Sequence, residues 1–257
     1  MLTTSNYQLR SMRYFIQFSY DGSNFHGSQS QPNGITIQQV MEQAFSTILR
    51  MPISLTFAGR TDAGVHALEM WAHFDCTICI SCEDITSHLN SLLPQSIAIQ
   101  KIVPVIESAH ARFSAIARTY QYYITTHKDP FKQRYSSRVA PGIDFNCMNQ
   151  AAELLLGKQD FASFCRVHTD VKTTFCTISE AYWNNYIFTI TADRFLRNMV
   201  RAIVGTLLDV GYGKRTIDDF QDIIASRNRC AAAQSAPASG LFLTHITYNE
   251  DIFLPTT

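Results

Sequence analysis

Residues 58–67, AGRTDAGVHA, bring a carboxylate, a guanidinium and two glycines into one short segment. Asp62 follows Arg60 by two residues, and the neighbouring positive charge favours the ionised carboxylate that a nucleophile must be. Gly59 and Gly64 allow positive φ angles and let a ligand come close to the backbone. A tight turn closed by an Arg–Asp ion pair uses the same residues. On chemistry alone, the segment is therefore either a catalytic loop or such a turn.

A second group of cations lies in residues 194–201, RFLRNMVR. On a helix over 194–210, a rotation of 100° per residue places Arg194, Arg197 and Arg201 within about 60° of one another. These arginines lack the carboxylates at i, i+4 that solvated helix faces often carry. The spacing predicts a basic face for an anionic ligand, with an ordinary solvated face as the alternative.

A third pattern, RTYQY, places Arg118, Tyr120 and Tyr122 on one face of a predicted strand. Residues 112–138 around it hold six basic residues against Asp129 alone, a local charge of +5. Aromatic residues alternate with these cations, and stacking together with phosphate neutralisation needs both kinds of side chain. The segment favours a nucleic-acid partner, although a solvated basic hairpin with core tyrosines gives the same pattern.

Two sets of residues resemble metal ligands. One is a C-x₂-C-x₂-C run at Cys76, Cys79 and Cys82, for which no nearby CxxC supplies the fourth ligand that a zinc or iron–sulfur site needs. The other set consists of Asp62, His66, His73 and Asp75. Asp62 and His66 do not form a helical i, i+4 pair here. We therefore expect no metal, and buried or half-buried cysteines.

The composition is that of a globular chain. Its 257 residues include 21 Lys+Arg and 21 Asp+Glu, so the formal charge is zero, and 46% are hydrophobic. Disordered chains are poorer in apolar residues and more highly charged. No apolar run approaches the roughly 18 residues that span a bilayer. With seven cysteines and no secretory signal, we expect a cytoplasmic protein. Zero net charge does not exclude nucleic acid, because net charge hides how the charges are distributed.

Hydrophobic periodicity and turn signals locate the elements that must position these residues. Predicted strands cover 13–20, 53–58, 67–75, 97–103, 118–125, 174–183, 186–192 and 241–248. Predicted helices cover 36–50, 83–93, 146–156, 194–210 and 217–225. Thr36 with Gln39 fits a capping box, Asn184-Asn185 is a hairpin turn signal, and Gly157 is suited to end a helix. Adjacent strands with few crossovers predict an antiparallel-rich α+β fold.

The element order recurs loosely, which predicts two similar antiparallel-sheet lobes with flanking helices and an active-site cleft between them. The expected organisation is a tail over 1–12, an N-terminal lobe over 13–108, a connecting segment with the Arg/Tyr strand over 109–143, a C-terminal lobe over 144–250 and a tail over 251–257.

In this order the motifs resemble the tRNA pseudouridine synthase A family. The segment GRTDAGVH is the most specific of them. The matching pieces, which cover nearly everything from 20 to 248, are Tyr20-Asp21-Gly22, Phe25-His26-Gly27, Gln29-x-Gln31, 58–67, Leu93-Pro94, His110-Ala111-Arg112-Phe113-Ser114-Ala115, Arg118-x-Tyr120-x-Tyr122, Asp160-Phe161-x-Ser163-Phe164, 195–205 and Gly240-Leu241.

The resemblance implies a two-lobed enzyme with the pseudouridine synthase fold, usually a homodimer and without a cofactor. Such an enzyme isomerises uridines at positions 38–40 of the tRNA anticodon stem-loop. Asp62 matches the family's essential aspartate, and Tyr120 matches the tyrosine that packs against the target base. Arg60 matches the arginine associated with flipping that base, and Arg201 the basic residue paired with the aspartate. Further expected RNA contacts are Arg112, Arg118, Arg194 and Arg197.

Three positions depart from the family pattern. Ser28 stands where the family usually has Trp, in a loop expected to contact RNA. Arg194 replaces a small or neutral residue, and Gln159 stands where His is common. Two other functions remain open: a non-catalytic RNA-binding protein would keep the basic cleft without needing Asp62, and a metal-dependent hydrolase would need the histidines to converge.

Overall fold

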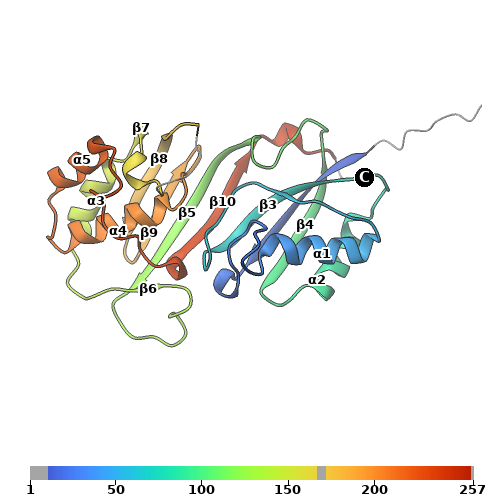
Figure 1. Cartoon of the computed structure of the whole chain (residues 1–257), viewed down its shortest axis with the longest axis horizontal. Coiled ribbons are helices and arrows are strands. Elements are labelled where there is room, and N and C mark those ends of the chain that lie inside the picture. Colours follow the sequence, from blue (N-terminus) through green and yellow to red (C-terminus); the bar gives the residue numbers. More distant parts are fainter. Residues whose placement is uncertain (1–10, 167–171, 256–257) are drawn as a thin grey trace, which may run out of the picture.

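The computed structural model describes residues 11–166 and 172–255, and in this part of the chain ten strands form one mixed sheet (Figure 1). Along the sheet the order is β4-β1-β3-β10-β5-β9-β8-β7, with β2 beside β3 and β6 beside β5. The strands are β1 (Met12–Tyr20), β2 (Thr56–Phe57), β3 (His66–Cys76), β4 (Ile97–Val105), β5 (Ala115–Thr125), β6 (Ser137–Arg138), β7 (Gly157–Asp160), β8 (Phe175–Asn184), β9 (Ile187–Ala192) and β10 (Leu241–Tyr248).

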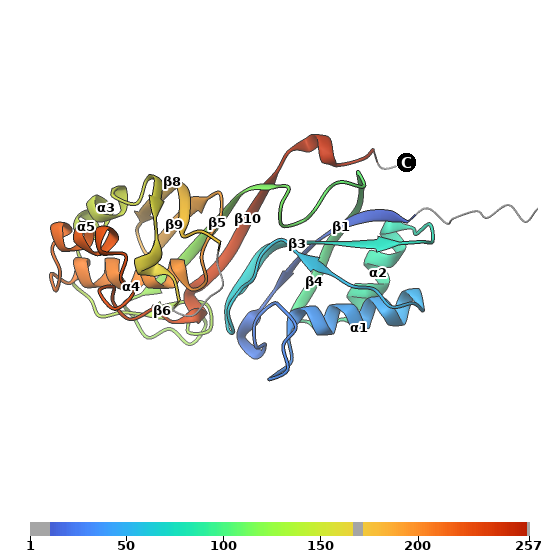
Figure 2. The same ribbon diagram turned by 45° about the horizontal axis from the view of Figure 1, so that its top comes forward.

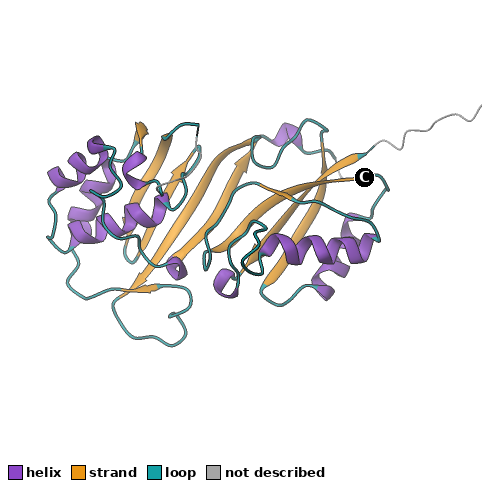
Figure 3. Ribbon diagram, viewed as in Figure 1, coloured by secondary structure: helices purple, strands orange, loops and turns teal. Residues whose placement is uncertain are grey.

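The predicted α+β fold is confirmed, but the two expected antiparallel lobes share one mixed sheet, because β10 joins the two halves. It pairs antiparallel with β5 and parallel with β3, where Phe242 lies opposite His66 and Leu243 opposite Ala67. The strand β5, expected in a connecting segment, is thus central to the sheet (Figure 3). Periodicity marks a strand but does not name its neighbours, so the sequence could not show this junction.

Five α-helices accompany the described strands: α1 (Ile37–Leu49), α2 (Cys82–Leu92), α3 (Phe145–Glu153), α4 (Met199–Gly211) and α5 (Ile217–Ser226). The first two lie along the β1–β4 half of the sheet, and the other three along the β7–β9 half (Figure 2). Phe45 of α1 packs on Phe74 of β3 with ring centroids 4.9 Å apart, in the core between helix and sheet. No helix in residues 11–166 and 172–255 is long and apolar enough to cross a membrane.

Several predicted boundaries hold and others move. The capping box of Thr36 and Gln39 is confirmed, and so is the hairpin, although its turn lies one residue later than predicted, at Asn185-Tyr186, where Asn185 has φ +51°. The predicted strand 53–58 is reduced to the two residues of β2. The strands β6 and β7 were not predicted. Gly157, with φ +88°, begins β7 rather than ending α3 directly.

The helix predicted over 194–210 begins only at Met199, so the predicted basic helix face does not exist. Asn198, at its N-cap, has φ +65°, a left-handed conformation that separates the preceding residues from the helix. Arg194 and Arg197 therefore lie in a loop, and Arg201 alone of the three is helical. The apolar residues of that loop have a spacing like that of a helix, and one of them, Leu196, is buried without being helical.

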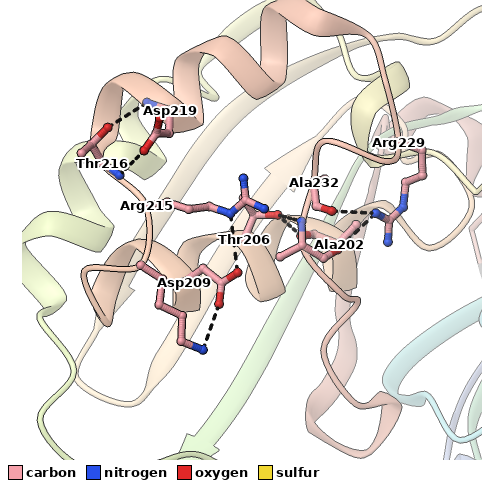
Figure 4. Close-up of polar contacts among 10 residues, drawn as sticks. Ala202, Thr206, Asp209, Arg215, Thr216, Asp219, Arg229 and Ala232 are labelled. Carbon is pink, nitrogen blue, oxygen red and sulfur yellow. Dashed lines mark hydrogen bonds and ion pairs between the residues drawn. The ribbon is translucent and has the colours of Figure 1, made fainter.

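A chain of small residues between α5 and β10 lies directly on α4. Thr206 donates its hydroxyl to the carbonyl of Ala202 at 2.8 Å and accepts the Ala233 N–H at 3.2 Å (Figure 4). A Cβ on Gly205 would lie only 2.0 Å from the Gln234 carbonyl oxygen. The absence of a side chain at Gly205 thus lets this loop, called here loop 231–239, settle on the helix.

Candidate active site

The loop between β2 and β3 carries Asp62 and is shaped by glycines from another part of the chain. It turns where the Val65 N–H donates to the Asp62 carbonyl at 3.1 Å. Gly27 has φ +94°, and a Cβ there would meet the Thr61 carbonyl oxygen at 2.9 Å. A Cβ on Gly22 would lie 2.0 Å from the Val65 carbonyl oxygen. Side chains at either glycine would therefore displace the backbone beside Asp62.

Ser28 lies behind this loop and is fully buried, so its own side chain faces the protein rather than the surface. Its hydroxyl accepts the Thr61 N–H at 2.9 Å, and its own N–H donates to the Thr61 carbonyl at 3.2 Å. The Tyr20 hydroxyl lies 2.8 Å from the Thr61 hydroxyl. Three contacts thus fix the residue that precedes Asp62. The departure from the family pattern at Ser28 was the only sequence signal of this role.

Ser28→Ala should lower the free energy of unfolding by about 1–3 kcal/mol, because it leaves the buried Thr61 N–H without an acceptor. Urea denaturation at constant m-value measures the change. The control is Ser91→Ala, which removes an exposed hydroxyl on α2 that donates to the Ser87 carbonyl. Equal losses in the two variants would show that the Ser28 hydroxyl does not stabilise the loop.

The Asp62 carboxylate lies where the two halves of the chain meet. Arg201 Nη1 is 3.6 Å from Oδ2, and Arg197 Nε is 3.8 Å from Oδ1. Both distances are longer than a hydrogen bond, so the two cations balance the charge without closing off the oxygens. The side chain is 24% exposed, against 52% for Arg197. This is a partly desolvated carboxylate that a substrate atom can still approach.

Arg201 is held in place by the loop 231–239. Its Nε donates to the Ala236 carbonyl at 2.7 Å, and the Ala236 N–H donates back to the Arg201 carbonyl at 2.9 Å. Asn198, at the N-cap of α4, donates its side-chain amide to the Ser235 hydroxyl at 2.6 Å. The Nε of the guanidinium thus anchors the side chain, while Nη1 points to Asp62. No pattern in the sequence indicates that small residues so far along the chain support the site.

Tyr120 on β5 is buried, and its ring meets Phe195 edge-on with centroids 5.0 Å apart. Burial raises the pKa of the Tyr120 hydroxyl; Arg118 opposes the rise and the negative charge of Asp62 adds to it. The hydroxyl is therefore protonated at neutral pH. An aromatic ring in this position offers a flat apolar contact close to the carboxylate.

Arg118 is bound to the protein itself. Its guanidinium donates to the carbonyls of Ala115 at 3.0 Å, Asp193 at 2.8 Å and Ala58 at 3.3 Å, and also to that of Arg112. These bonds tie the start of β5 to the end of the strand that leads into the Asp62 loop. The prediction of an RNA contact for Arg118 therefore has little geometric support.

The remaining arginines fall in two places. Arg60 and Arg112 are exposed and line one hollow of about 280 Å³ beside the Asp62 loop. Arg194 is half-buried, and its charge acts on the Cys176 thiol, whose pKa burial raises to about 12. Arg197 and Arg201 thus lie together at the carboxylate. Arg60 and Arg112 lie together at a neighbouring hollow, and Arg194 is directed toward β8.

The possible metal ligands do not converge. Within the described ranges, no group of three or more His, Cys, Asp or Glu residues is placed to hold a metal ion. His66 Nδ1 accepts the Gly22 N–H at 3.2 Å, and its ring stacks on Phe242 at 4.5 Å. His73 Nδ1 accepts the Ala111 N–H at 3.1 Å. Both histidines support the backbone of the site rather than forming a joint binding site.

The buried His73 makes the stability of the protein pH-dependent. Burial, together with the positive charges of His110 and Arg13 and against the opposing charge of Asp75, lowers the pKa of His73 from 6.5 to about 4. As the pH falls, His73 is therefore protonated in the unfolded chain before it is protonated in the folded protein. The stabilisation is complete above pH 6.5 and is lost as pH falls toward 4.

Between pH 7 and pH 5, His73 should cost the wild type about 2 kcal/mol of unfolding free energy. Urea midpoints at the two pH values, for wild type and His73→Gln, measure the difference. The variant should lose less stability on acidification, because it has no group to protonate there. Equal losses of stability in wild type and variant would show that the pKa of His73 is not lower in the folded protein than in the unfolded chain.

Comparison with known proteins divides the chain into the same two halves that meet at Asp62. A family model described as tRNA pseudouridine synthase matches residues 16–114 and 151–249. The chain belongs to the tRNA pseudouridine synthase family. The two matched segments place Asp62 in the first and Arg197 and Arg201 in the second, so the charged site of this family member is shared between its two related halves.

Three relatives extend this finding over nearly the whole chain, and each has the name tRNA pseudouridine synthase A. The Parabacteroides distasonis protein is 51% identical over 246 residues, 94% of this chain and 98% of its own length. The Bacteroides fragilis protein is 52% identical over 247 residues, with the same two coverages. The Bacillus licheniformis protein is 40% identical over 246 residues, 93% of this chain and all of its own length.

Proposed function

We propose that the chain is a tRNA pseudouridine synthase that isomerises uridines at positions 38–40 of the anticodon stem-loop, with Asp62 as its nucleophile. The observation that carries the proposal is the partly exposed carboxylate between two arginines, beside a buried tyrosine. Relatives about 50% identical over 94% of the chain have the name of this enzyme. The choice of positions 38–40 follows from the resemblance of the ordered motifs to the family.

The reaction rearranges one nucleotide without a net change in its atoms. The bond between ribose C1′ and base N1 breaks, the base turns, and C1′ bonds to C5. N1 ends with a proton, and the proton on C5 is lost. Departure of N1 leaves C1′ electron-poor, as in glycoside hydrolysis, and a close carboxylate stabilises or traps it. Attack by Asp62 on C1′ and attack on uracil C6 are the two routes that use this carboxylate.

The surroundings of Asp62 suit a base that has left its helix. Extruding a stacked base costs a few kcal/mol, which new contacts must offset. The Tyr120 ring, braced by Phe195, offers an apolar face to the uracil, and Arg197 and Arg201 keep positive charge near the carboxylate. Because the Tyr120 hydroxyl is protonated, we assign this residue to packing against the base.

Arg60→Ala should lower kcat more than it weakens tRNA binding. Arg60 is exposed and only two residues from Asp62, so it can fill the space that an extruded base leaves. We expect kcat to fall on the order of 10- to 100-fold, with the Kd for tRNA changed less than about fivefold. Single-turnover tritium release and filter binding measure the two effects. Equal losses in kcat and binding would indicate a simple phosphate contact instead.

The proposed function is tested by tritium release from tRNA transcripts that carry [5-³H]uridine. Transcripts with cytidine at position 38, 39 or 40, singly and together, locate the reacting uridine. Release from the parent transcript, and loss of release when all three positions are cytidine, is the expected result. Binding of tRNA without release would favour a non-catalytic RNA-binding protein. Release that persists in the triple replacement would contradict the assigned positions.

We also propose that two copies of the chain form the active particle. Exposed apolar side chains surround a hollow of about 490 Å³ and offer a contact surface; they are Leu68, Phe131, Tyr135 and Tyr186. A dimer would also join the basic surfaces of two protomers for RNA. Light scattering should give twice the mass of one chain. A fully active monomer would contradict the proposal.

A further inference from the structure

Phe113 is an exposed aromatic side chain on the segment between β4 and β5. Its side chain is 76% exposed, and single exposed apolar residues are common on protein surfaces. What distinguishes this one is the backbone that carries it. His110 Nδ1 accepts the N–H groups of Arg112 at 3.1 Å and of Phe113 at 3.3 Å. The Ser114 N–H donates to the His110 carbonyl at 2.8 Å.

Further contacts hold the same segment to the sheet. The Tyr248 hydroxyl donates to the Ala111 carbonyl at 2.6 Å, and the Ala111 N–H donates to His73. The Phe113 ring lies 4.4 Å from the His110 ring. An aromatic face is thus presented to solvent by a fixed backbone, which lowers the entropy that a ligand must overcome.

The charges around this ring favour an anionic partner. The Arg112 guanidinium lies 5.7 Å from the centre of the Phe113 ring, and Arg60 lines the same hollow. Among the ten described residues that line this hollow, two are arginines and none carries a carboxylate. A flat apolar face with cations at its rim fits a nucleobase and its flanking phosphates.

The hollow is also linked to the catalytic loop. Arg118 donates to the carbonyls of both Ala58 and Arg112, so one guanidinium holds the strand end before Arg60 and the segment that carries Phe113. A ligand on Phe113 therefore binds at a fixed position relative to the Asp62 loop.

We propose that Phe113 is a stacking platform for an unpaired base of the RNA substrate near the target uridine, with Arg112 holding an adjacent phosphate. The proposal rests on the proposed function, and it adds a contact for a second nucleotide. Stacking of one base on an aromatic residue typically changes affinity by roughly 10-fold or more.

The test compares Phe113→Ala, Phe113→Trp and the control Tyr182→Ala, which removes another exposed ring, on β8. For Phe113→Ala we expect the Kd and KM for tRNA to rise roughly 10-fold, with kcat within about threefold of wild type. Phe113→Trp should restore binding, since stacking needs only an aromatic face. Tyr182→Ala should leave both constants unchanged. An unchanged Kd in Phe113→Ala, or a tryptophan variant as weak as the alanine, would overturn the proposal.

Salt dependence separates stacking from charge. Arg112→Ala should reduce the slope of log K against log salt by about one, because it removes a phosphate contact. Phe113→Ala should weaken binding with an unchanged slope. A reduced slope in Phe113→Ala would show that the ring acts only by positioning Arg112, against the proposal. These binding measurements need no turnover, so they still test Phe113 if the wild type releases no tritium.

Discussion

Asp62→Asn is expected to abolish tritium release, with a loss in kcat on the order of 10⁴-fold or more. The amide keeps the volume of the carboxylate but removes its charge and its nucleophilicity. Binding of tRNA should change less than about threefold, because the cations that surround the site remain. Single-turnover release and filter binding on the same preparations measure both effects.

The chain offers a matched control for this substitution. Asp209, on α4, lies 3.5 Å from both Lys214 and Arg215, and its side chain is 26% exposed against 24% for Asp62. Asp209→Asn therefore removes a carboxylate of similar exposure and similar pairing outside the site. It should leave turnover unchanged. Measurable turnover in Asp62→Asn, or an equal loss in Asp209→Asn, would exclude Asp62 as the nucleophile.

The residues that we propose for the chemistry could be selected from the sequence because they lie in short, specific segments. Asp62 and Arg60 share one loop, Tyr120 alternates along one strand, and Arg201 lies at the start of a helix. Local spacing left a tight turn and a core tyrosine open as alternatives, and the resemblance to the family selected these residues. The prediction that Arg194 and Arg197 lie on this helix was wrong. Asn198 has a left-handed conformation and the helix begins only after it, and hydrophobic periodicity does not reveal a φ angle.

The residues that support the site could not be predicted in the same way. Ser28 holds Thr61 across 33 positions of sequence, and Ala236 holds Arg201 across 35. In each contact one partner is a backbone group, which every residue type carries, so a sequence pattern does not identify that partner. The joining of the two halves through β10 is hidden for a similar reason, since strand pairing is non-local.

Arg201→Met is expected to lower kcat on the order of 100-fold while the KM for tRNA changes less than about threefold. The side chain is 21% exposed and is anchored at Ala236, so its Nη1 charge stays at one place near Asp62. Loss of that charge leaves the carboxylate with only the more exposed Arg197. The effect therefore falls on the chemical step, because Arg201 positions Asp62 rather than the RNA.

Arg201→Lys and Arg197→Met distinguish positioning from charge alone. A lysine keeps the charge but has one nitrogen, which cannot both donate to the Ala236 carbonyl and lie near Asp62 as the forked guanidinium does. We expect a loss of about 10-fold for Arg201→Lys and a loss below 10-fold for Arg197→Met, since Arg197 is 52% exposed and its interaction is screened by solvent. Steady-state kcat and KM for the three variants measure these effects. A rise confined to KM in Arg201→Met would mean that this arginine contacts RNA phosphate, and the helix α4 would then belong to the RNA-binding surface and not to the support of Asp62.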